Sequence, residues 1–516
     1  MSLLKFLSCL SACFIFLSSV EAKQESTEGI SWLKSGMPVA LQQAKKQNQP
    51  LFVYWGAVWC PPCNVVKTTI FNDSKFIQST RDYVSVYLDG DTEEAQKWGQ
   101  KLKVMGYPTL MILSPDGKEV LRLSPSNTVE DLVSTMDYSK NMWNPITDVL
   151  TQVLSAKNID AKKIHSLAMY SWSQDKDVSE AAKNYSQKLF ALDKKLKESQ
   201  LQKDRAILFL TALSLKFESL EDDQKLAASE KTQYKNRVKA ILNNPELLQA
   251  NIMNLAYEAE NLVSQLTQAK DEGLSDERSQ FIQLYLKKMR QYRGLKGLTF
   301  DHYYSTFSPS IDFADKFKIE LDKSDKKQLI DYTAKTLPIT TESKARQAML
   351  SDASYMLFKY GLKDQAKQLL TTELNASSNP YYLMSTLGFF EKEDDNSELA
   401  LQWYEKAYLS AKGPATKLQW YGSYIRNLIK LKPENKESIK SHVSTLLDKY
   451  TYMADSFWGR NYRVLLSVKK STSKWAGEND EISWKESLQL NGLKKCSLSS
   501  KEVYKTSCEK FYKEFI

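Results

Sequence analysis

The spacing of hydrophobic residues changes along this chain, and the change separates two kinds of predicted structure. Between about residues 30 and 140, short apolar runs alternate with stretches whose pattern suits a helix. A continuous apolar run such as LFVYW is typical of a strand that is buried on both faces. The predicted strands are 51–55, 83–89, 108–114 and 118–123. We therefore expect residues 30–140 to form a small α/β unit with a mixed sheet flanked by helices.

The turns and helix starts of this first unit are also readable. The tight-turn sequence SPDG at 114–117 predicts that the last two strands form a hairpin. Helices are expected directly after the first strand, from about Thr92 to Lys101, and from Asn127 or Thr128, either of which can cap a helix.

From about residue 145 the strand patterns stop and amphipathic helical patterns follow one another. Asn244 and Pro245 mark one helix start, since Asn caps well and Pro suits the first turn. One predicted helix places four apolar residues on a single face: Phe281, Leu284, Tyr285 and Met289. We expect residues 145–516 to be an all-α region, arranged as a bundle or as a helical repeat.

A repeat of 34 residues supports the second arrangement. The matched pairs are Ala366 and Ala400, Leu370 and Tyr404, Tyr355 and Phe389, Pro380 and Pro414, and Gly388 and Gly422. Residues 350–430 resemble the tetratricopeptide repeat, a helix-turn-helix unit. The resemblance is partial, because Met384 and Glu391 stand where that family has aromatic residues. Chance periodicity within ordinary helical packing stays open as an alternative.

Composition agrees with a folded, mostly helical protein of more than one domain. Of the 516 residues 42% are hydrophobic, and Gly and Pro number only 17 and 14. The net charge of +9 is spread along lysine-rich helix faces, with no compact basic block or nucleic-acid motif. We expect no nucleic acid as a partner, while an acidic protein partner stays open.

The N-terminus has the layout of a secretory signal. Lys5 precedes an apolar stretch, and Val20, Glu21 and Ala22 fit a small-residue cleavage site. We expect residues 1–22 to be a signal peptide and the mature protein to be periplasmic or secreted. A lipoprotein anchor at Cys13 is the alternative, but the apolar run continues beyond that cysteine. The stretch is short for a bilayer span, which needs about 20 residues, so we expect no stable span in the mature chain.

Removal of this segment leaves four cysteines, Cys60, Cys63, Cys496 and Cys508. An even set in an exported protein favours pairing. Cys60 and Cys63 form a Cys-x-x-Cys pair, which can be half of a zinc site, a structural bridge or a redox centre. Zinc needs two further ligands at suitable spacing, which the sequence does not offer, and so short a loop gains little stability from closure. We expect a redox pair, with no metal and no cofactor.

The predicted position of the pair supports redox chemistry. At a strand-to-helix junction Cys60 occupies the helix start, where free backbone N–H groups and the helix dipole stabilise a thiolate. We expect Cys60 to be the nucleophile and Cys63, one turn further along, to be the resolving cysteine. Pro61 and Pro62 suit the first helical turn and stiffen the loop between the sulfurs.

The stretch from Trp59 to Cys63, with Gly106-Tyr107-Pro108-Thr109 some 45 residues later, resembles the thioredoxin superfamily. The GYPTL loop is similar to that of protein disulfide isomerases, and TTIFNDSKFI is similar to the thioredoxin-like ends of periplasmic disulfide interchange proteins. The resemblance implies that Pro108 is cis and faces the sulfurs, and that the backbone of Tyr107 receives the substrate. It also implies support of the site by Trp59, and protein substrates that carry disulfides or thiols, together with a redox partner.

One departure from that family concerns proton transfer. The family places a buried aspartate six residues before the first cysteine, and Tyr54 stands there in this chain. We expect Asp89, Glu93 or water to take over that role. The two prolines add no charge between the cysteines, which favours a reductant or an exchange protein over a strong oxidant.

The second cysteine pair and the long helical region complete the predictions. Cys496 and Cys508 are expected to form a structural disulfide that fastens the C-terminal end, with an electron relay between the two pairs as the alternative. We expect a thiol-disulfide oxidoreductase whose helical region binds partners. The alternative is a helical binding or chaperone-like protein that uses the thioredoxin-like module for docking. The aromatic residues Trp403, Trp420 and Tyr424 can line a binding groove, but at helical spacing they are more often core.

Overall fold

The computed structural model describes residues 29–196, 201–221, 224–268, 275–498 and 502–515. The predicted signal peptide at 1–22, with the lipoprotein alternative at Cys13, lies outside the described residues. Export and final location therefore stay predictions.

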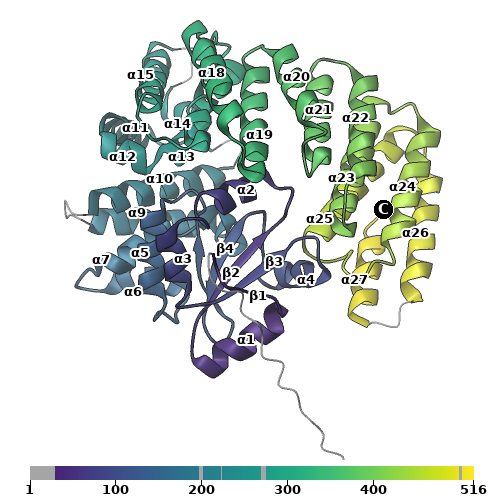
Figure 1. Cartoon of the computed structure of the whole chain (residues 1–516), viewed down its shortest axis with the longest axis horizontal. Coiled ribbons are helices and arrows are strands. Elements are labelled where there is room, and N and C mark those ends of the chain that lie inside the picture. Colours follow the sequence, from purple (N-terminus) through teal and green to yellow (C-terminus); the bar gives the residue numbers. More distant parts are fainter. Residues whose placement is uncertain (1–28, 197–200, 222–223, 269–274, 499–501, 516) are drawn as a thin grey trace, which may run out of the picture.

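A five-stranded mixed sheet forms the centre of the N-terminal part (Figure 1). Its strands are β1 (Trp32–Leu33), β2 (Leu51–Gly56), β3 (Val84–Asp89), β4 (Thr109–Leu113) and β5 (Glu119–Leu123). The order across the sheet is β1-β3-β2-β4-β5, with β1 and β2 parallel to β3 and with β4 antiparallel to both β2 and β5. Every residue of the central strand β2 is buried, which confirms the interpretation of its apolar run. The predicted mixed sheet and its final hairpin are confirmed.

Five helices flank this sheet: α1 (Gly36–Gln47), α2 (Pro61–Thr68), α3 (Ser74–Thr80), α4 (Glu93–Lys101) and α5 (Val129–Ser139). Thr92 caps α4 and Thr128 caps α5, each through a side-chain oxygen that accepts a backbone N–H three residues on. The sequence analysis did not name β1, α1 or α3. The strand β1 is only two residues long, too short for a periodic pattern to show.

All remaining elements among the described residues are helical. They are α6 (Ile146–Ser155), α7 (Ala161–Met169), η1 (Trp172–Gln174), α8 (Lys176–Glu180), α9 (Ala182–Lys195), α10 (Gln202–Glu218), α11 (Ala228–Asn243), α12 (Pro245–Ala250), α13 (Ile252–Tyr257), α14 (Ala259–Leu266), α15 (Asp276–Arg293), α16 (Phe300–Ser305), α17 (Ser308–Phe317), α18 (Lys323–Thr336), η3 (Leu337–Ile339), α19 (Ser343–Lys359), α20 (Lys363–Glu373), α21 (Pro380–Glu393), α22 (Ser397–Ser410), α23 (Pro414–Leu431), α24 (Lys436–Tyr450), α25 (Gly459–Glu478), α26 (Ile482–Ser497) and α27 (Glu502–Lys513). The predicted all-α region is confirmed.

The helical region forms an arc around the sheet (Figure 1). At the start of the arc, α7 packs against α5. Further along the chain α19 packs against α2, and near the other end of the arc α25 packs on α4. At its start, the apolar core of the sheet continues without a break into α6–α10. A bridge between Leu123 of β5 and Tyr170 after α7 adds a backbone connection. The arc and the sheet thus pack as one body at both ends of the arc.

The predicted local details of the helices largely hold. The Asn244 side chain caps α12 by accepting the N–H groups of Glu246 and Leu247. On α15, Phe281, Tyr285 and Met289 are fully buried, while Leu284 is half-buried. This face packs into the core of the middle part of the arc.

The repeated positions at 366–422 occupy matching places in alternate helices, in α20 and α22 and in α21 and α23. Pro380 begins α21 and Pro414 begins α23, and each helix pairs with the next one along the chain. A side chain at Gly388 would meet the Tyr404 ring at 3.0 Å, so that glycine lets α21 and α22 pack closely. The helices therefore repeat in register, and the resemblance to one named repeat type stays a prediction.

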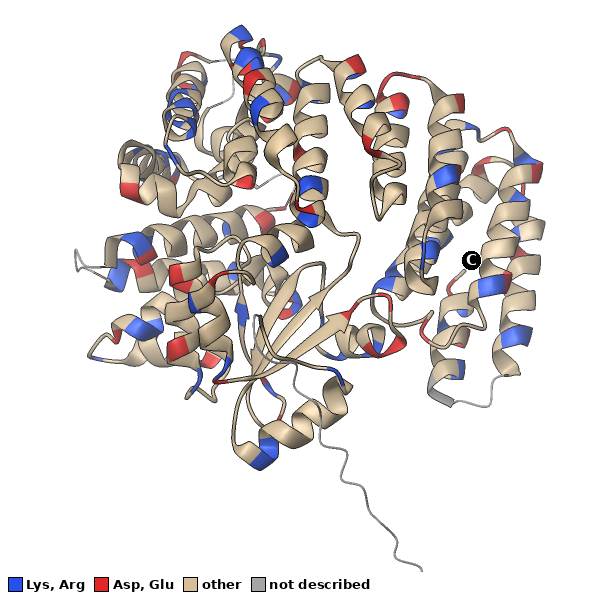
Figure 2. Cartoon of the chain, in the orientation of Figure 1, with Lys and Arg blue, Asp and Glu red and all other residues tan. Residues whose placement is uncertain are grey.

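Acidic and basic side chains are interspersed along the helices (Figure 2). The net charge of +9 thus does not produce one basic face in the view shown. In the parts of the chain that the structure describes, none of the helices has the length and apolar character needed to cross a bilayer.

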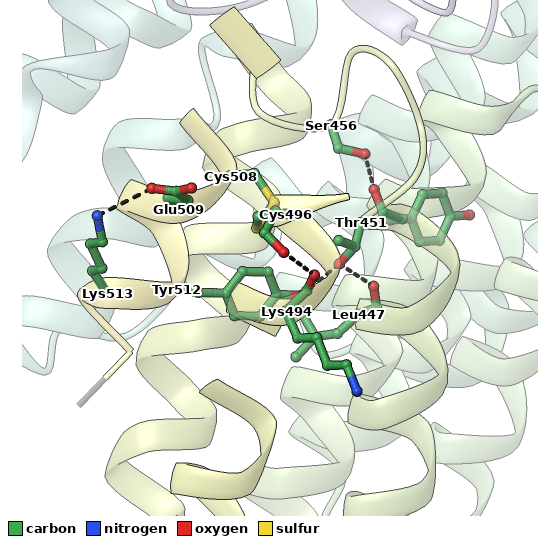
Figure 3. The surroundings of a disulfide bond; sticks show 11 residues. Leu447, Thr451, Ser456, Lys494, Cys496, Cys508, Glu509, Tyr512 and Lys513 are labelled. Atoms are coloured by element: carbon green, nitrogen blue, oxygen red, sulfur yellow. Dashed lines mark hydrogen bonds and ion pairs between the residues drawn. A yellow bond between two sulfur atoms is a disulfide. The ribbon is translucent and has the colours of Figure 1, made fainter. Parts of the chain in front are cut away.

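A disulfide joins Cys496 of α26 to Cys508 of α27, with a Cα–Cα distance of 5.6 Å (Figure 3). Both cysteines are fully buried in the C-terminal core, beside a hydrogen bond of 2.5 Å between the Thr451 and Tyr512 hydroxyls. The Cys60–Cys63 pair belongs to a separate cluster. No contact between the two pairs supports the electron relay.

Candidate active site

The two redox candidates lie at the start of α2. Cys60 is the N-cap residue, and its sulfur accepts a hydrogen bond of 3.3 Å from the backbone N–H of Cys63. Pro61 and Pro62 occupy the first turn, where a missing N–H group carries no cost. Both cysteines are free thiols in the structure. The geometry is that of a dithiol at a strand-to-helix junction, as the sequence pattern predicts.

The surroundings of this dithiol shield both cysteines from solvent. Cys60 is only 4% exposed and Cys63 is fully buried. The covering residues come from the far end of the helical arc: Tyr381, Ala407, Ala411 and Trp420, with Tyr382 at the edge. The chain therefore covers its own active-site face.

Polar contacts fix this cover to the loop that carries the cysteines. The indole Nε1 of Trp59 donates to Thr416 Oγ1 of α23 at 2.6 Å. From α19, Gln347 donates to the Trp59 carbonyl at 3.3 Å and accepts from Asn64 at 3.2 Å. Asn379, at the start of α21, donates to the Val58 carbonyl at 3.4 Å. Three successive parts of the arc thus converge on one short loop.

The segment implied to receive substrate is covered as well. The Tyr107–Pro108 peptide bond is cis, the geometry that the resemblance implied. The guanidinium of Arg460, at the start of α25, lies 5.2 Å from the Tyr107 ring and 5.4 Å from the Trp59 ring. Its Nη2 donates to Asp91 Oδ1 at 3.1 Å. Arg460 thus lies against both Trp59 and Tyr107, and Tyr107 is half-buried.

Burial also changes the acidity of the nucleophile. Burial raises the pKa of the Cys60 thiol, and the neighbouring Cys63 raises it further, whereas the N–H at the helix start lowers it. Cys60 therefore does not have the expected low pKa while it is covered. Burial raises its pKa more than the N–H group at the helix start lowers it. This effect could not be predicted from local sequence, because the covering residues lie several hundred positions away.

Tyr54, which replaces the family aspartate, lies behind the resolving cysteine. It is 1% exposed, and its hydroxyl has no hydrogen-bond partner among the described residues. Burial raises the pKa of Tyr54, and the charge of Cys63 raises it further. Gly56 leaves the space that the phenol fills, since a Cβ at that position would collide with the hydroxyl. Tyr54 can donate a hydrogen bond to a Cys63 thiolate, but it cannot accept the Cys63 proton.

Lys67 is the ionisable group that the sequence analysis missed. Its ammonium lies 5.8 Å from the Tyr54 ring and 5.2 Å from the Tyr87 ring. Burial lowers the pKa of Lys67, while Cys63 and Asp89 act in the opposite direction. Lys67 follows Cys63 by four residues on α2, and this spacing was the available signal.

The two carboxylates predicted as proton acceptors, Asp89 and Glu93, have different surroundings. Asp89 at the end of β3 interacts with Lys67, and burial raises the pKa of its carboxyl. Glu93 instead lies at the N-terminus of α4, where its charge acts on Asp455. The group behind Cys63 therefore consists of Lys67 and Asp89, with Tyr54 as a hydrogen-bond donor.

The three aromatic residues considered for a binding groove differ in burial. Trp420 and Tyr424 are each 7% exposed, as the core interpretation requires, and Trp403 is half-buried. Trp420 also contacts the active site, because its ring centroid lies 5.9 Å from that of Trp59. Trp420 and Tyr424 are thus core residues, and Trp420 also forms part of the cover.

A Cys-x-x-Cys at a helix start, on a mixed sheet with a cis-proline loop, defines the class of thioredoxin-like proteins. Residues 37–140 match the family model described as a thioredoxin-like domain. Thioredoxin H4 of Arabidopsis thaliana is 32% identical over 96 residues, which are 18% of this chain and 74% of that protein. The chain belongs to the thioredoxin family through this domain.

Two further relatives are more distant. The thiol:disulfide interchange protein DsbD of Pseudomonas fluorescens is 28% identical over 82 residues, 16% of this chain and 14% of that protein. DsbD of Campylobacter jejuni is 24% identical over 98 residues, 19% of this chain and 17% of that protein. The chain thus spans less than a fifth of the length of either protein.

Proposed function

We propose that this protein is an exported thiol-disulfide oxidoreductase in which the helical arc decides which disulfides reach Cys60. The family supports thiol-disulfide exchange, and its members act through the same pair of cysteines that lies at the start of α2. The observation that carries the proposal is the hydrogen-bonded cover of Gln347, Asn379 and Thr416 over the dithiol loop.

The reaction follows from the two sulfurs. The Cys60 thiolate attacks one sulfur of a substrate disulfide and forms a mixed disulfide, and the first thiolate leaves. The Cys63 thiolate then attacks the Cys60 sulfur, releases the second thiol, and leaves a Cys60–Cys63 disulfide. Two electrons pass to the substrate, and the two cysteine protons finally reside on its thiols. Asp89, which interacts with Lys67, is the carboxylate proposed to take the Cys63 proton, and the Lys67 ammonium stabilises the resulting Cys63 thiolate.

The direction proposed is reduction or exchange. A strong oxidant owes its potential to a stabilised thiolate in the reduced state. Burial raises the pKa of Cys60 and the Pro-Pro loop adds no charge, and both favour the disulfide form of the protein. Burial also acts to raise the pKa of Cys63, but hydrogen bonds from Cys60, Ala57 and Tyr54 lower it overall, which opposes this preference in part. The substrates proposed are disulfides in the exported compartment, including those of proteins that engage the arc and move it from α2.

Trapping tests this proposal in the full-length protein. In Cys63→Ala the mixed disulfide on Cys60 cannot be resolved, so captured substrates stay linked and can be identified after non-reducing separation. Cys60→Ala is the matched control and should capture nothing. Absence of any adduct on Cys63→Ala, together with no reaction of the wild-type dithiol with small disulfides, would overturn the proposal.

A second candidate has its own observation. The face that thioredoxins use for substrates here binds the chain's own helices, through Trp59 and Arg460. This favours a binding or chaperone-like protein whose thioredoxin-like module docks the arc. The double variant Cys60→Ser, Cys63→Ser separates the candidates, because a docking module keeps its cellular role without either sulfur and an oxidoreductase loses it.

A further inference from the structure

A cavity of about 380 Å³ lies in the arc directly behind the aromatic cover of the dithiol. Small-molecule sites in proteins usually measure about 300–1,000 Å³ and are lined by aromatic residues with a few polar groups. Six side chains define this cavity: Tyr257, Asp352, Tyr355, Tyr382, Phe389 and Trp420. They come from α13, α19, α21 and α23, so the arc forms the cavity without the sheet.

The inner wall of the cavity is one side-chain layer from the active site. Tyr382 and Trp420 line the cavity, and their ring centroids lie 6.4 Å and 5.9 Å from that of Trp59. Tyr382 also packs against the cluster that contains Cys60, and its electrostatic partners include both Cys60 and Asp352. Movement of the Tyr382 ring would therefore connect the cavity with the Cys60 sulfur.

The outer part of the cavity is accessible. Tyr257 and Tyr355 line it and are 64% and 39% exposed. The indole of Trp420 is 7% exposed, and its Nε1 has no hydrogen-bond partner among the described residues. An aromatic entrance and an unsatisfied buried donor at the inner wall both suit an occupant with polar ends.

The acidic residue in the lining indicates that the occupant is positively charged. Apart from the tyrosines, Asp352 is the only ionisable residue in the lining. Burial raises the pKa of the Asp352 carboxyl to about 7, and Asp301 behind it adds to the rise. One carboxylate oxygen of Asp301 is itself buried without a hydrogen-bond partner among the described residues. The nearby Lys359 is paired with Asp315 at 2.6 Å. A cation would stabilise both carboxylates, and the tyrosine faces would add cation–π attraction.

We propose that this cavity binds low-molecular-weight disulfides that carry an ammonium group, with the ammonium at Asp352 and the disulfide at the Tyr382 wall. This inference rests on the proposed function and names a substrate class for it. Cys60 attacks the sulfur presented by the bound molecule, an aminothiol leaves, and Cys63 releases the second aminothiol. The dithiol is oxidised to a disulfide and the small disulfide is reduced to two thiols.

Three probes with the same carbon skeleton near sulfur test the charge. Cystamine carries two ammonium groups, bis(2-hydroxyethyl) disulfide is neutral, and 3,3′-dithiodipropionate carries two carboxylates. The pre-reduced full-length protein is mixed with each probe, and oxidation of the dithiol is followed by mass spectrometry of alkylated samples. Each rate is divided by the rate of the same probe with dithiothreitol, which removes intrinsic reactivity. We expect a normalised preference of roughly tenfold for cystamine over the neutral probe, the size of one charged hydrogen bond.

Variants assign the preference to the cavity. Asp352→Asn should abolish the preference, so that cystamine and the neutral probe react at similar normalised rates. Glu398→Gln, on the exposed start of α22, removes the same charge elsewhere in the arc and should leave the preference intact. The redox-inert 1,6-diaminohexane should inhibit oxidation by cystamine in the wild type, whereas 1,6-hexanediol should not.

The outcomes are distinguishable from failure of the proposed function. If the neutral probe oxidises Cys60 and Cys63 but cystamine shows no normalised preference, the cavity proposal is overturned and the oxidoreductase proposal stands. A preference that survives Asp352→Asn also overturns the cavity proposal. If no probe oxidises the dithiol, the proposed oxidoreductase function itself is overturned.

Discussion

The indole nitrogen of Trp59 donates a hydrogen bond to the Thr416 hydroxyl at 2.6 Å, although the two residues are 357 positions apart in the sequence. The residue before the nucleophile is thus fixed by a helix near the opposite end of the chain. This contact is where the cover meets the dithiol most directly, and it can be changed without altering either sulfur.

Thr416→Val should loosen the cover, because valine keeps the shape of threonine but can neither accept the indole N–H nor donate to the Asp91 carboxylate. Loss of one buried hydrogen-bond partner costs about 1–3 kcal/mol, so we expect the rate of Cys60 alkylation by iodoacetamide to rise at least several-fold. Thr416→Ser keeps the hydroxyl and should react like the wild type. An unchanged alkylation rate in Thr416→Val would show that this contact does not hold the cover closed.

The pH dependence of stability should reflect burial of the nucleophile. Because burial raises the pKa of Cys60 in the folded state, the folded protein favours the protonated thiol. The resulting stability is present below the pKa of the unfolded thiol, near 8.5, and is lost as pH rises above it. Urea unfolding of the reduced protein should show a decline between about pH 8 and pH 9.5 that is smaller in Cys60→Ser. Equal declines in both proteins would contradict the assigned shift.

Lys67 and Tyr54 should act on the second half of the reaction. Lys67→Gln removes the cation that stabilises the Cys63 thiolate, and a rise of one unit in the pKa of Cys63 would lower its thiolate fraction about tenfold. We expect the mixed disulfide on Cys60 to persist longer, while its formation rate changes little. Rapid acid quench followed by mass spectrometry measures both steps. Tyr54→Phe should slow the resolving step less, because it removes only a hydrogen bond.

The C-terminal disulfide should matter for stability and not for redox activity. Closing a loop of this size contributes on the order of 3 kcal/mol in the chain-entropy account. The double variant Cys496→Ser, Cys508→Ser should therefore unfold at lower urea concentration, with normal oxidation of Cys60 and Cys63 by a neutral disulfide. Loss of dithiol reactivity in a variant that is still folded would instead support the electron relay.

Much of the fold was readable because local patterns determined it. The apolar run of β2, the SPDG turn and the Thr128 cap each depend on neighbours within a few residues. The start of α2 at Cys60 follows in the same way. Strand β1 and helix α3 were not predicted, because segments of two and seven residues are too short to show a clear hydrophobic period.

The cover over the active site could not be predicted in that way. It depends on Gln347, Thr416 and Arg460, which belong to no recognisable motif. Their role appears only in the folded chain, where the arc contacts the domain. The acidity of Cys60 changes with it, because desolvation comes from residues distant in sequence. The redox pair was therefore predictable, while its accessibility was a property of the whole chain.

The return of α25 onto α4 also has a consequence for biogenesis. Ribosomes add about 5–20 residues each second, so the 357 positions between Trp59 and Thr416 separate their synthesis by roughly 20–70 seconds. Throughout that interval the nascent chain presents an uncovered pair of thiols. Closure of the cover is therefore a late event in folding, because its hydrogen-bond donor and acceptor are synthesised far apart in time.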